Sequence, residues 1–388
     1  MAVIVVPARF VPLVSKECIE KGVEAAIIIS AGFGEIGEKG LTAELQKVID
    51  SSKKTKFLGP NCFGVLTPGK LNTTFSEEKR MKIPKFGNVA FMSQSGALGV
   101  TILDWMHTQE FGLSKFVSYG NAMGLDEADF LEFVANDKET KVITMYLEGV
   151  KRGRKFFEIA KKAGAKKPII ALKGGVTEET HKATASHTGS LAGSARVYHG
   201  LFKQTGITQA NSLEELFAFA KIFENEPLPK GKRVGIISNG GGYAIITADE
   251  VVKNGLQLAG FSEKTRQTCR KAFPPTVNIG NPLDLVGDAD AQRYKIAIEN
   301  LLNDDNVDML AVLVLFNVPT INETIIGEIA KLRKKAKKPM IVVSTGSEFT
   351  KRMLQELEKN GVVTFGYPSR AAKALKALAD YAEFKKEK

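Results

Sequence analysis

The sequence predicts an α/β protein made of three doubly wound parallel-sheet domains, the first of them incomplete. Short apolar runs rich in β-branched residues alternate with helix-length amphipathic segments along all 388 residues. The strand candidates are apolar on both faces, as strands are in parallel sheets that helices cover on two sides. A chain of this length exceeds one ordinary domain and fits two or three.

The strand candidates form three groups along the chain. They are 2–6, 25–29 and 56–58, then 88–92, 116–118, 142–147 and 168–173, and finally 233–238, 310–315, 340–344 and 362–365. The charged segment 77–87 precedes a fresh strand, and the polar, proline-bearing segment 224–232 follows a helix-like stretch. We therefore predict domains over 1–86, 87–226 and 231–388. The second and third domains begin alike, which suggests an internal structural repeat.

Composition narrows the class of protein. The net charge of +11 comes mostly from lysines scattered along helix-like segments, without aromatic interleaving, so nucleic-acid binding is not expected. A basic surface does suit polyanionic small ligands. The sequence contains no run of about twenty apolar residues, so a membrane span is not expected. Cys18, Cys62 and Cys269 lack metal-ligand spacing and are odd in number, which favours reduced thiols, no metal site and a cytoplasmic protein.

Two strand-to-helix turns are candidate anion sites. A helix start presents main-chain N–H groups and partial positive charge, and glycine lets an anion approach the backbone closely. The residues of the two turns are Ser93, Gln94, Ser95 and Gly96, and Asn239, Gly240, Gly241 and Gly242. Either turn alone is more often cap and turn chemistry than a ligand site, and it is the pair that favours phosphate binding.

His187 lies in a loop of small residues after the strand candidate 168–173, whereas the other histidines lie in helix-like or charged segments. Imidazole is nucleophilic and titrates near physiological pH, so a histidine facing two phosphate-sized sites suggests a carrier of phosphoryl groups. Glu148 follows the strand candidate 142–147 and is expected at the same sheet edge, where its carboxylate would hold the second ring nitrogen. Residue types alone favour this interpretation no more than the alternative, in which His187 is a hydrogen-bonded loop histidine and Glu148 an ordinary acid near a helix start.

Four motifs together resemble a known family. They are Ser-His-Thr-Gly-Ser-Leu-Ala-Gly at 186–193, Ser-Gln-Ser-Gly at 93–96, Gly-Pro-Asn-Cys at 59–62 and Asn-Pro-Leu-Asp at 281–284. In order and spacing they look like the α subunit of ADP-forming acetyl-CoA synthetase. This family belongs to the NDP-forming acyl-CoA synthetase superfamily, which includes succinyl-CoA synthetase. The resemblance runs over essentially the whole chain.

The resemblance implies a reaction and roles for residues. Acyl-CoA and phosphate would give an acyl phosphate and free CoA, and the phosphoryl group would pass to a histidine and then to ADP. His187 matches the phosphorylated histidine, and Glu148 matches the acid that orients it. The two turns match the paired helix starts that hold the phosphate. Residues matching the CoA and acyl site are Gly32, Asn61, Ser118, Gly120 and Asn121.

The resemblance also implies an organisation and partners. The first domain would be a Rossmann-like CoA-binding domain and the other two flavodoxin-like. The usual member begins with a further βα segment carrying a glycine-rich loop, so this sequence starts in the middle of that domain. An ATP-grasp β subunit would bind ADP or ATP with Mg²⁺, in an α2β2 assembly. Acetate is the family's default acid, and abundant lysine and glutamate hint at a thermophile.

Two other readings of the sequence stay open. One is a non-catalytic CoA-binding or flavodoxin-like scaffold protein. The other is the CoA-binding part of another acyltransferase, although no acetyltransferase motif accompanies the turns.

Overall fold

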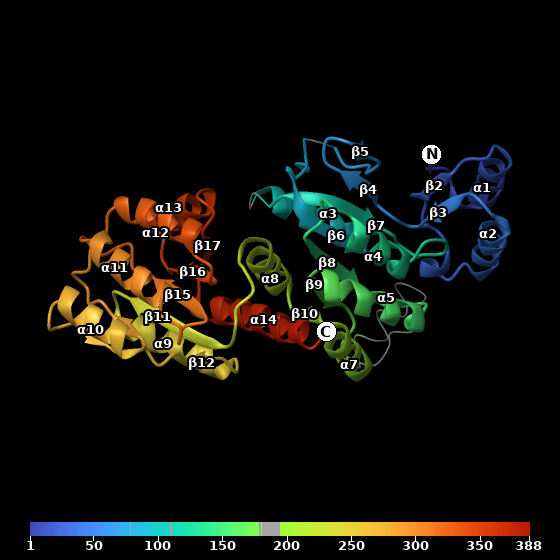
Figure 1. Ribbon diagram of the computed structural model, residues 1–388. Coiled ribbons are helices and arrows are strands. Elements are labelled where there is room, and N and C mark those ends of the chain that lie inside the picture. The colour runs from blue at the N-terminus through green and yellow to red at the C-terminus, as the bar shows by residue number, and fades with distance from the viewer. Residues whose placement is uncertain (78, 109–110, 178–179, 181–194) are drawn as a thin grey trace. The chain divides into compact units, whose positions relative to one another are not determined.

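The computed structural model describes residues 1–77, 79–108, 111–177, 180 and 195–388, and it confirms the predicted α/β class (Figure 1). The chain divides into two compact units, Met1–Leu216 and Phe217–Lys388. Within the described residues, no helix combines the length and apolarity that crossing a membrane requires.

The first unit opens with a small parallel sheet (Figure 1, blue). Its strands lie in the order β1 (Ala2–Ile4), β2 (Ala25–Ile28) and β3 (Lys56–Leu58). The intervening helices are η1 (Ala8–Phe10), α1 (Val11–Glu20), η2 (Gly34–Ile36) and α2 (Lys39–Ser51). Helix α2 places Leu45 and Ile49, one turn apart, in the core with β2, while its other face stays polar.

A larger sheet forms the rest of the first unit. Its order is β10-β9-β8-β6-β7-β4-β5, with parallel pairing from β10 to β7 and antiparallel pairing of β4 with β7 and β5. The parallel strands are β6 (Phe86–Ser93), β7 (Leu113–Ser118), β8 (Val142–Leu147), β9 (Ile169–Lys173) and β10 (Ile207–Ala210). The antiparallel hairpin is β4 (Gly64–Thr67) and β5 (Leu71–Asn72).

Helices cover both faces of this sheet, as the two-sided apolar strands predicted. On one face, α4 (Glu127–Asn136), α5 (Gly153–Lys166) and α7 (Ala195–Thr205) share a core with alternate residues of β6, β8 and β9. Helix α3 (Gly96–Thr108) packs against β6 and β7. The approach is so close that a Cβ on Gly99 would lie 2.7 Å from the Phe116 ring. Strand β6 ends three residues before α3 begins, so the turn between them lies at the edge of the sheet.

The second unit holds one mixed sheet in the order β13-β14-β11-β15-β16-β17, with β12 beside β11. Parallel pairing joins β14, β11, β15, β16 and β17, while β13 and β14 are antiparallel. The strands are β11 (Arg233–Ser238), β12 (Gln257–Leu258), β13 (Asn278–Ile279), β14 (Leu283–Asp284), β15 (Met309–Leu313), β16 (Met340–Val343) and β17 (Val363–Phe365).

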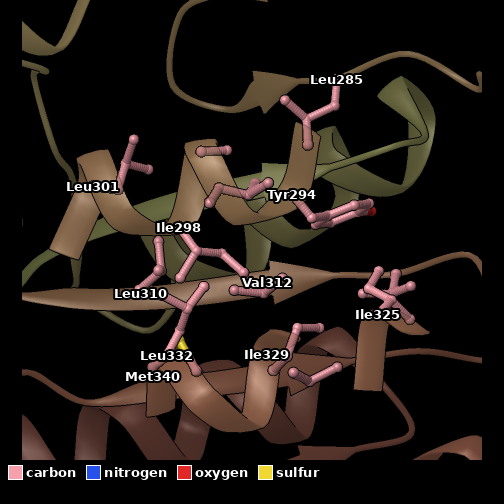
Figure 2. Close-up of a cluster of buried hydrophobic side chains, with 14 of the residues drawn as sticks. Leu285, Tyr294, Ile298, Leu301, Leu310, Val312, Ile325, Ile329, Leu332 and Met340 are labelled. Atoms are coloured by element: carbon pink, nitrogen blue, oxygen red, sulfur yellow. The ribbon is translucent and has the colours of Figure 1, made fainter. Parts of the chain in front are cut away.

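The helices of the second unit pack a large apolar core. They are α9 (Gly241–Lys253), α10 (Glu263–Ala272), α11 (Ala291–Leu302), α12 (Thr324–Lys335), α13 (Glu348–Lys359) and α14 (Pro368–Lys386), and α8 (Leu213–Asn225) leads into the unit. Figure 2 shows Tyr294 and Ile298 of α11, with Ile329 of α12, around Val312 of β15. The fully buried Tyr294 hydroxyl donates a hydrogen bond to the Leu313 carbonyl at 2.6 Å, so this core leaves the group satisfied.

Candidate functional site

A cavity of about 860 Å³ in the first unit gathers most of the residues predicted for a site there. It lies at the carboxyl ends of parallel strands, which is where ligands bind in open α/β sheets. One part of its lining follows β2, another comes from the segment between β3 and β6, and the third follows β6, β7 and β8. The lining residues include Glu35, Asn61, Phe63, Phe75, Gln94, Ser95, Gly96, Ala97, Gly120, Asn121 and Glu148.

The turn between β6 and α3 supplies the helix start at the cavity. The Ser95 hydroxyl accepts a hydrogen bond from the Leu98 N–H at 3.3 Å, so Ser95 caps α3. Gly96 and Ala97, in the first turn of α3, line the cavity. Ser93 is fully buried, and its hydroxyl donates to the Ser95 carbonyl at 2.6 Å, outside the cavity lining. The turn can therefore present main-chain donors and a partial positive charge to an anion.

The side chain of Gln94 connects this turn to Glu148. Its Oε1 atom accepts hydrogen bonds from the main-chain N–H groups of Glu148, at 2.7 Å, and Gly149, at 3.1 Å. The registers of β6 and β8 pair Ser93 with Tyr146, which brings the two strand ends level. Glu148 is 5% exposed and lines the cavity, so Glu148 and the start of α3 border one space.

A hydrogen-bonded network crosses the cavity on the side of the small sheet. Glu35 accepts hydrogen bonds from the Gly32 N–H and from the Asn121 side-chain amide, both at 2.5 Å. Asn121 in turn accepts one from the Asn61 amide at 3.3 Å. Burial alone would raise the pKa of Glu35, but these hydrogen bonds outweigh burial and lower it. Glu35 thus fixes the Asn121 side chain, which in turn holds the Asn61 amide, and all three residues line the cavity.

Close backbone packing shapes the same wall. Asn61 has a φ of 57° and follows a cis peptide bond between Gly59 and Pro60. A Cβ on Gly120 would lie 2.2 Å from the Asn61 carbonyl oxygen, so only glycine fits at position 120. Ser118, another predicted residue, is fully buried outside the lining, where its hydroxyl accepts from the Phe63 N–H at 2.9 Å.

The lining also includes residues that the sequence did not mark as a site, among them Glu35, Phe63 and Phe75. Glu35 follows the glycine-bracketed stretch Gly32-Phe33-Gly34 just after a strand, and this spacing was a usable signal. Phe63 and Phe75 meet edge to face with ring centroids 4.8 Å apart. No sequence pattern marked Phe75, which is 66% exposed and is placed at the cavity by the chain's path after β5.

The second predicted turn lies in the second unit, at the start of α9. The Asn239 side-chain oxygen accepts a hydrogen bond from the Leu315 N–H at 2.9 Å, and Ser238 bonds the Gly240 N–H at 3.0 Å. Gly241 begins the helix, and a Cβ there would lie 2.8 Å from a carboxylate oxygen of Asp284. The two turns thus share a strand-turn-helix form, each within its own unit.

His187 lies outside the described residues. The flanking described elements are β9, which ends at Lys173, and α7, which begins at Ala195. Strand β9 pairs with β8 and runs parallel to it, so it ends at the same sheet edge as Glu148.

Two family models match the chain. Residues 86–223 match the "Succinyl-CoA ligase like flavodoxin domain", and residues 234–384 match the "Ligase-CoA domain". The first match contains the β6–α3 turn and Glu148, and the second contains the β11–α9 turn.

Known proteins match nearly the full chain. The α subunits of ADP-forming acetate–CoA ligases II and I from Pyrococcus furiosus are each 42% identical to it, over 99% of this chain and 84% and 83% of their own lengths. The solved structure of dinucleotide-forming acetyl-coenzyme A synthetase 1 from Candidatus Korarchaeum cryptofilum, in complex with phosphate and ADP, is 37% identical with a TM-score of 0.92. That match covers 99% of this chain and 83% of the other. The predicted resemblance is confirmed: the chain belongs to the family of ADP-forming acetate–CoA ligase α subunits.

Proposed function

We propose that the chain is the α subunit of an ADP-forming acyl-CoA ligase that interconverts acyl-CoA, phosphate and ADP with a free acid, CoA and ATP. One observation supports this most strongly. The start of α3 and Glu148 line a single cavity that is large enough for a phosphate together with part of a thioester. Acetate is the acid that the relatives' names favour.

The first step joins phosphate to the acyl group. A phosphate oxygen forms a bond to the thioester carbonyl carbon, the carbon–sulfur bond breaks, and the CoA sulfur leaves as a thiolate that takes up a proton. Ser95, Gly96 and the amide nitrogen of Gln94 bind the phosphate at the start of α3, and Ser93 supports this turn through its hydrogen bond to the Ser95 carbonyl. The CoA and acyl portions bind along Asn61, Gly120 and Asn121, and Gly32 and the buried Ser118 support that wall through their hydrogen bonds to Glu35 and Phe63.

The second step moves the phosphoryl group to His187. The imidazole nitrogen attacks phosphorus, the bond between phosphorus and the acyl oxygen breaks, and the acid leaves as a carboxylate. Glu148 accepts a hydrogen bond from the other ring nitrogen and so fixes the ring for attack. A dry site protects the phosphohistidine from water.

The third step passes the phosphoryl group to ADP. The turn formed by Asn239, Gly240, Gly241 and Gly242 supplies the second phosphate site, and ADP binds with Mg²⁺ on a separate ATP-grasp β subunit. The relatives named as α subunits support such a partner, and we propose an α2β2 assembly. We retain the predicted domains 1–86, 87–226 and 231–388 as functional divisions of the chain.

The test uses the full chain with its β subunit. Acetyl-CoA, phosphate and ADP should yield ATP and free thiol together, and labelled ATP should leave acid-labile, base-stable phosphate on the chain. His187→Ala should abolish both ATP synthesis and label, while hydroxylamine still traps acetyl phosphate. His199→Ala, at an exposed position of α7, is the matched control and should behave as wild type. Label that persists in His187→Ala assigns the carrier elsewhere, and a wild-type assembly without label or turnover favours the scaffold alternative.

A further inference from the structure

Lys173 is a buried lysine at the last position of β9, directly behind the candidate site. Its side chain is 5% exposed, and its ammonium group donates hydrogen bonds to two main-chain carbonyls, those of Glu148, at 2.9 Å, and Gly174. The ammonium also lies over the Tyr198 ring, 4.8 Å from its centroid. Burial lowers the pKa of Lys173, and the Glu148 carboxylate opposes that effect. Burial of a charged group costs free energy, so a buried lysine at this position suggests a specific role.

The contacts of Lys173 complete a frame around Glu148. Gln94 holds the main-chain N–H of Glu148 from β6, and Lys173 holds its carbonyl from β9. Burial, and next to it the neighbouring Glu148 carboxylate, raise the pKa of Tyr146. The main-chain N–H and carbonyl of Glu148 are therefore both held by neighbouring side chains.

The same frame sets where the chain leaves β9. A Cβ on Gly174 would lie 2.5 Å from the Tyr146 hydroxyl oxygen, so Gly174 packs directly on that ring. The Gly174 N–H donates to the Leu147 carbonyl at 2.8 Å, and the Gly174 carbonyl accepts from Lys173. The end of β8 and the exit from β9 are thus tied together at one point.

We propose that Lys173 is a positioning residue of the ligase, which fixes the Glu148 main chain and the exit of β9 so that the Glu148 carboxylate meets the phosphoryl acceptor. This inference rests on the proposed function. Its physical basis is that misplacement of a reacting group by about 1 Å costs on the order of 10²-fold in rate. The lysine itself touches no reacting atom.

The chain offers a matched control at the other end of the same strand. Lys167 precedes β9, and its ammonium also donates to two main-chain carbonyls, those of Val134, at 3.1 Å, and Asp137. Burial lowers the pKa of Lys167 as it does that of Lys173. The two lysines therefore share a structural task, but only Lys173 lies at the candidate site.

The experiment compares Lys173→Met with Lys167→Met in the full chain with its β subunit. Both variants should lose melting temperature, because each loses an ammonium group that holds two main-chain carbonyls. Lys173→Met should lower kcat and the rate of phosphate labelling by about 10²-fold, with the KM for acetyl-CoA changed less than threefold. Lys167→Met should keep the wild-type kcat. Equal kcat values in the two variants overturn the proposal.

A second pair covers the case in which Lys173→Met does not fold. Lys173→Gln retains an N–H donor for one carbonyl, and a kcat at least tenfold below that of Lys167→Gln supports the proposal, whereas equal values overturn it. The wild-type assembly separates the two hypotheses. If it makes no ATP from acetyl-CoA, phosphate and ADP, the proposed function fails. If it does, the variant pairs alone decide the role of Lys173.

Discussion

The Oε1 atom of Gln94 accepts a hydrogen bond from the main-chain N–H of Glu148 at 2.7 Å, although the two residues are 54 positions apart in the chain. A second bond, from Gly149, uses the same oxygen. The residue that follows β6 therefore determines where the chain runs after β8. Because Oε1 is engaged in this way, the phosphate-binding role proposed for Gln94 belongs to its amide nitrogen.

Replacement of Gln94 by leucine should damage both the fold and the reaction. Gln94→Leu removes the acceptor of two buried N–H groups, and we expect a loss of about 1–3 kcal/mol in the free energy of unfolding with a large fall in kcat. Gln94→Glu keeps the acceptor but adds negative charge beside the phosphate. It should keep the two hydrogen bonds but raise the KM for phosphate, as steady-state kinetics would reveal. Equal stability of the leucine variant and wild type would contradict the bridging role.

Glu148→Gln isolates the charge of the proposed orienting acid. The amide is nearly isosteric, so the fold should persist, while transfer of the phosphoryl group to histidine should slow by orders of magnitude because imidazolium loses its counter-charge. Rapid-quench measurement of chain labelling checks this. Glu158→Gln on the exposed face of α5 is the control and should label normally. An unchanged labelling rate in Glu148→Gln would reduce Glu148 to a structural role.

Phe75→Ala tests the aromatic wall of the cavity. The acyl group of an acyl phosphate must lie beside the phosphate, and Phe63, whose Cβ lies 3.4 Å from a Cβ built on Gly96, places the Phe63–Phe75 pair there. Removal of the Phe75 ring should widen the acyl region and shift kcat/KM by about tenfold toward larger acids such as phenylacetate over acetate. Phe133→Ala, exposed on α4, should leave the preference unchanged. The same preference in both variants would place the acyl group elsewhere.

Strands with continuous apolar runs were predictable from the sequence, and several others were not. The predicted strands 142–147 and 233–238 coincide with β8 and β11 residue for residue. In contrast, β10 was missed because Thr208 and Gln209 break its apolar run, and the short hairpin of β4 and β5 carries too few residues for a pattern. The predicted strand 2–6 ends early, at Ile4, because the chain turns into η1 after Pro7.

The site was predictable where one local motif carries the chemistry. The β6–α3 turn, Asn61, Gly120, Asn121 and Glu148 were identified from strand ends and motifs, and the cavity brings them together. The places of Glu35 and Lys173 at the site depend on contacts between segments that are far apart in the sequence. Glu35 and its partner Asn121, for example, are separated by 86 residues. Residue type also misled in one respect, since the hydroxyls of Ser93 and Ser118 bond main-chain groups outside the lining.

Arg333→Met should strongly destabilise the second unit. Arg333 binds Glu226 at 2.8 Å, with the Glu226 side chain fully buried, and Glu226 also accepts from the Met340 N–H at 2.9 Å. Removal of the arginine leaves a buried carboxylate without its partner, which costs about 3–5 kcal/mol. Arg270→Met breaks an exposed pair with Glu263 and should cost less than about 1 kcal/mol. Denaturant titration of the two variants measures both losses, and similar values would show that the buried pair contributes little.

Glu127 should make the stability of the first unit depend on pH. It is 1% exposed, its Oε1 accepts from the Lys151 N–H at 3.0 Å, and within the described residues its Oε2 has no hydrogen-bond partner. Burial raises the pKa of Glu127 to about 7, with the charge of Asp126 adding to the effect. The folded chain therefore binds a proton that the unfolded chain releases between the ordinary carboxyl pKa and about 7. The contribution of this group to stability is complete below that window and is lost as the pH rises through it, by at most about 1.4 kcal/mol per pH unit.

Glu127→Gln should thus gain stability relative to wild type between pH 5 and pH 7.5 in urea titrations, whereas Glu132→Gln, exposed on the same helix, should not. Parallel pH profiles for Glu127→Gln and wild type would mean that Glu127 is already ionised at pH 5.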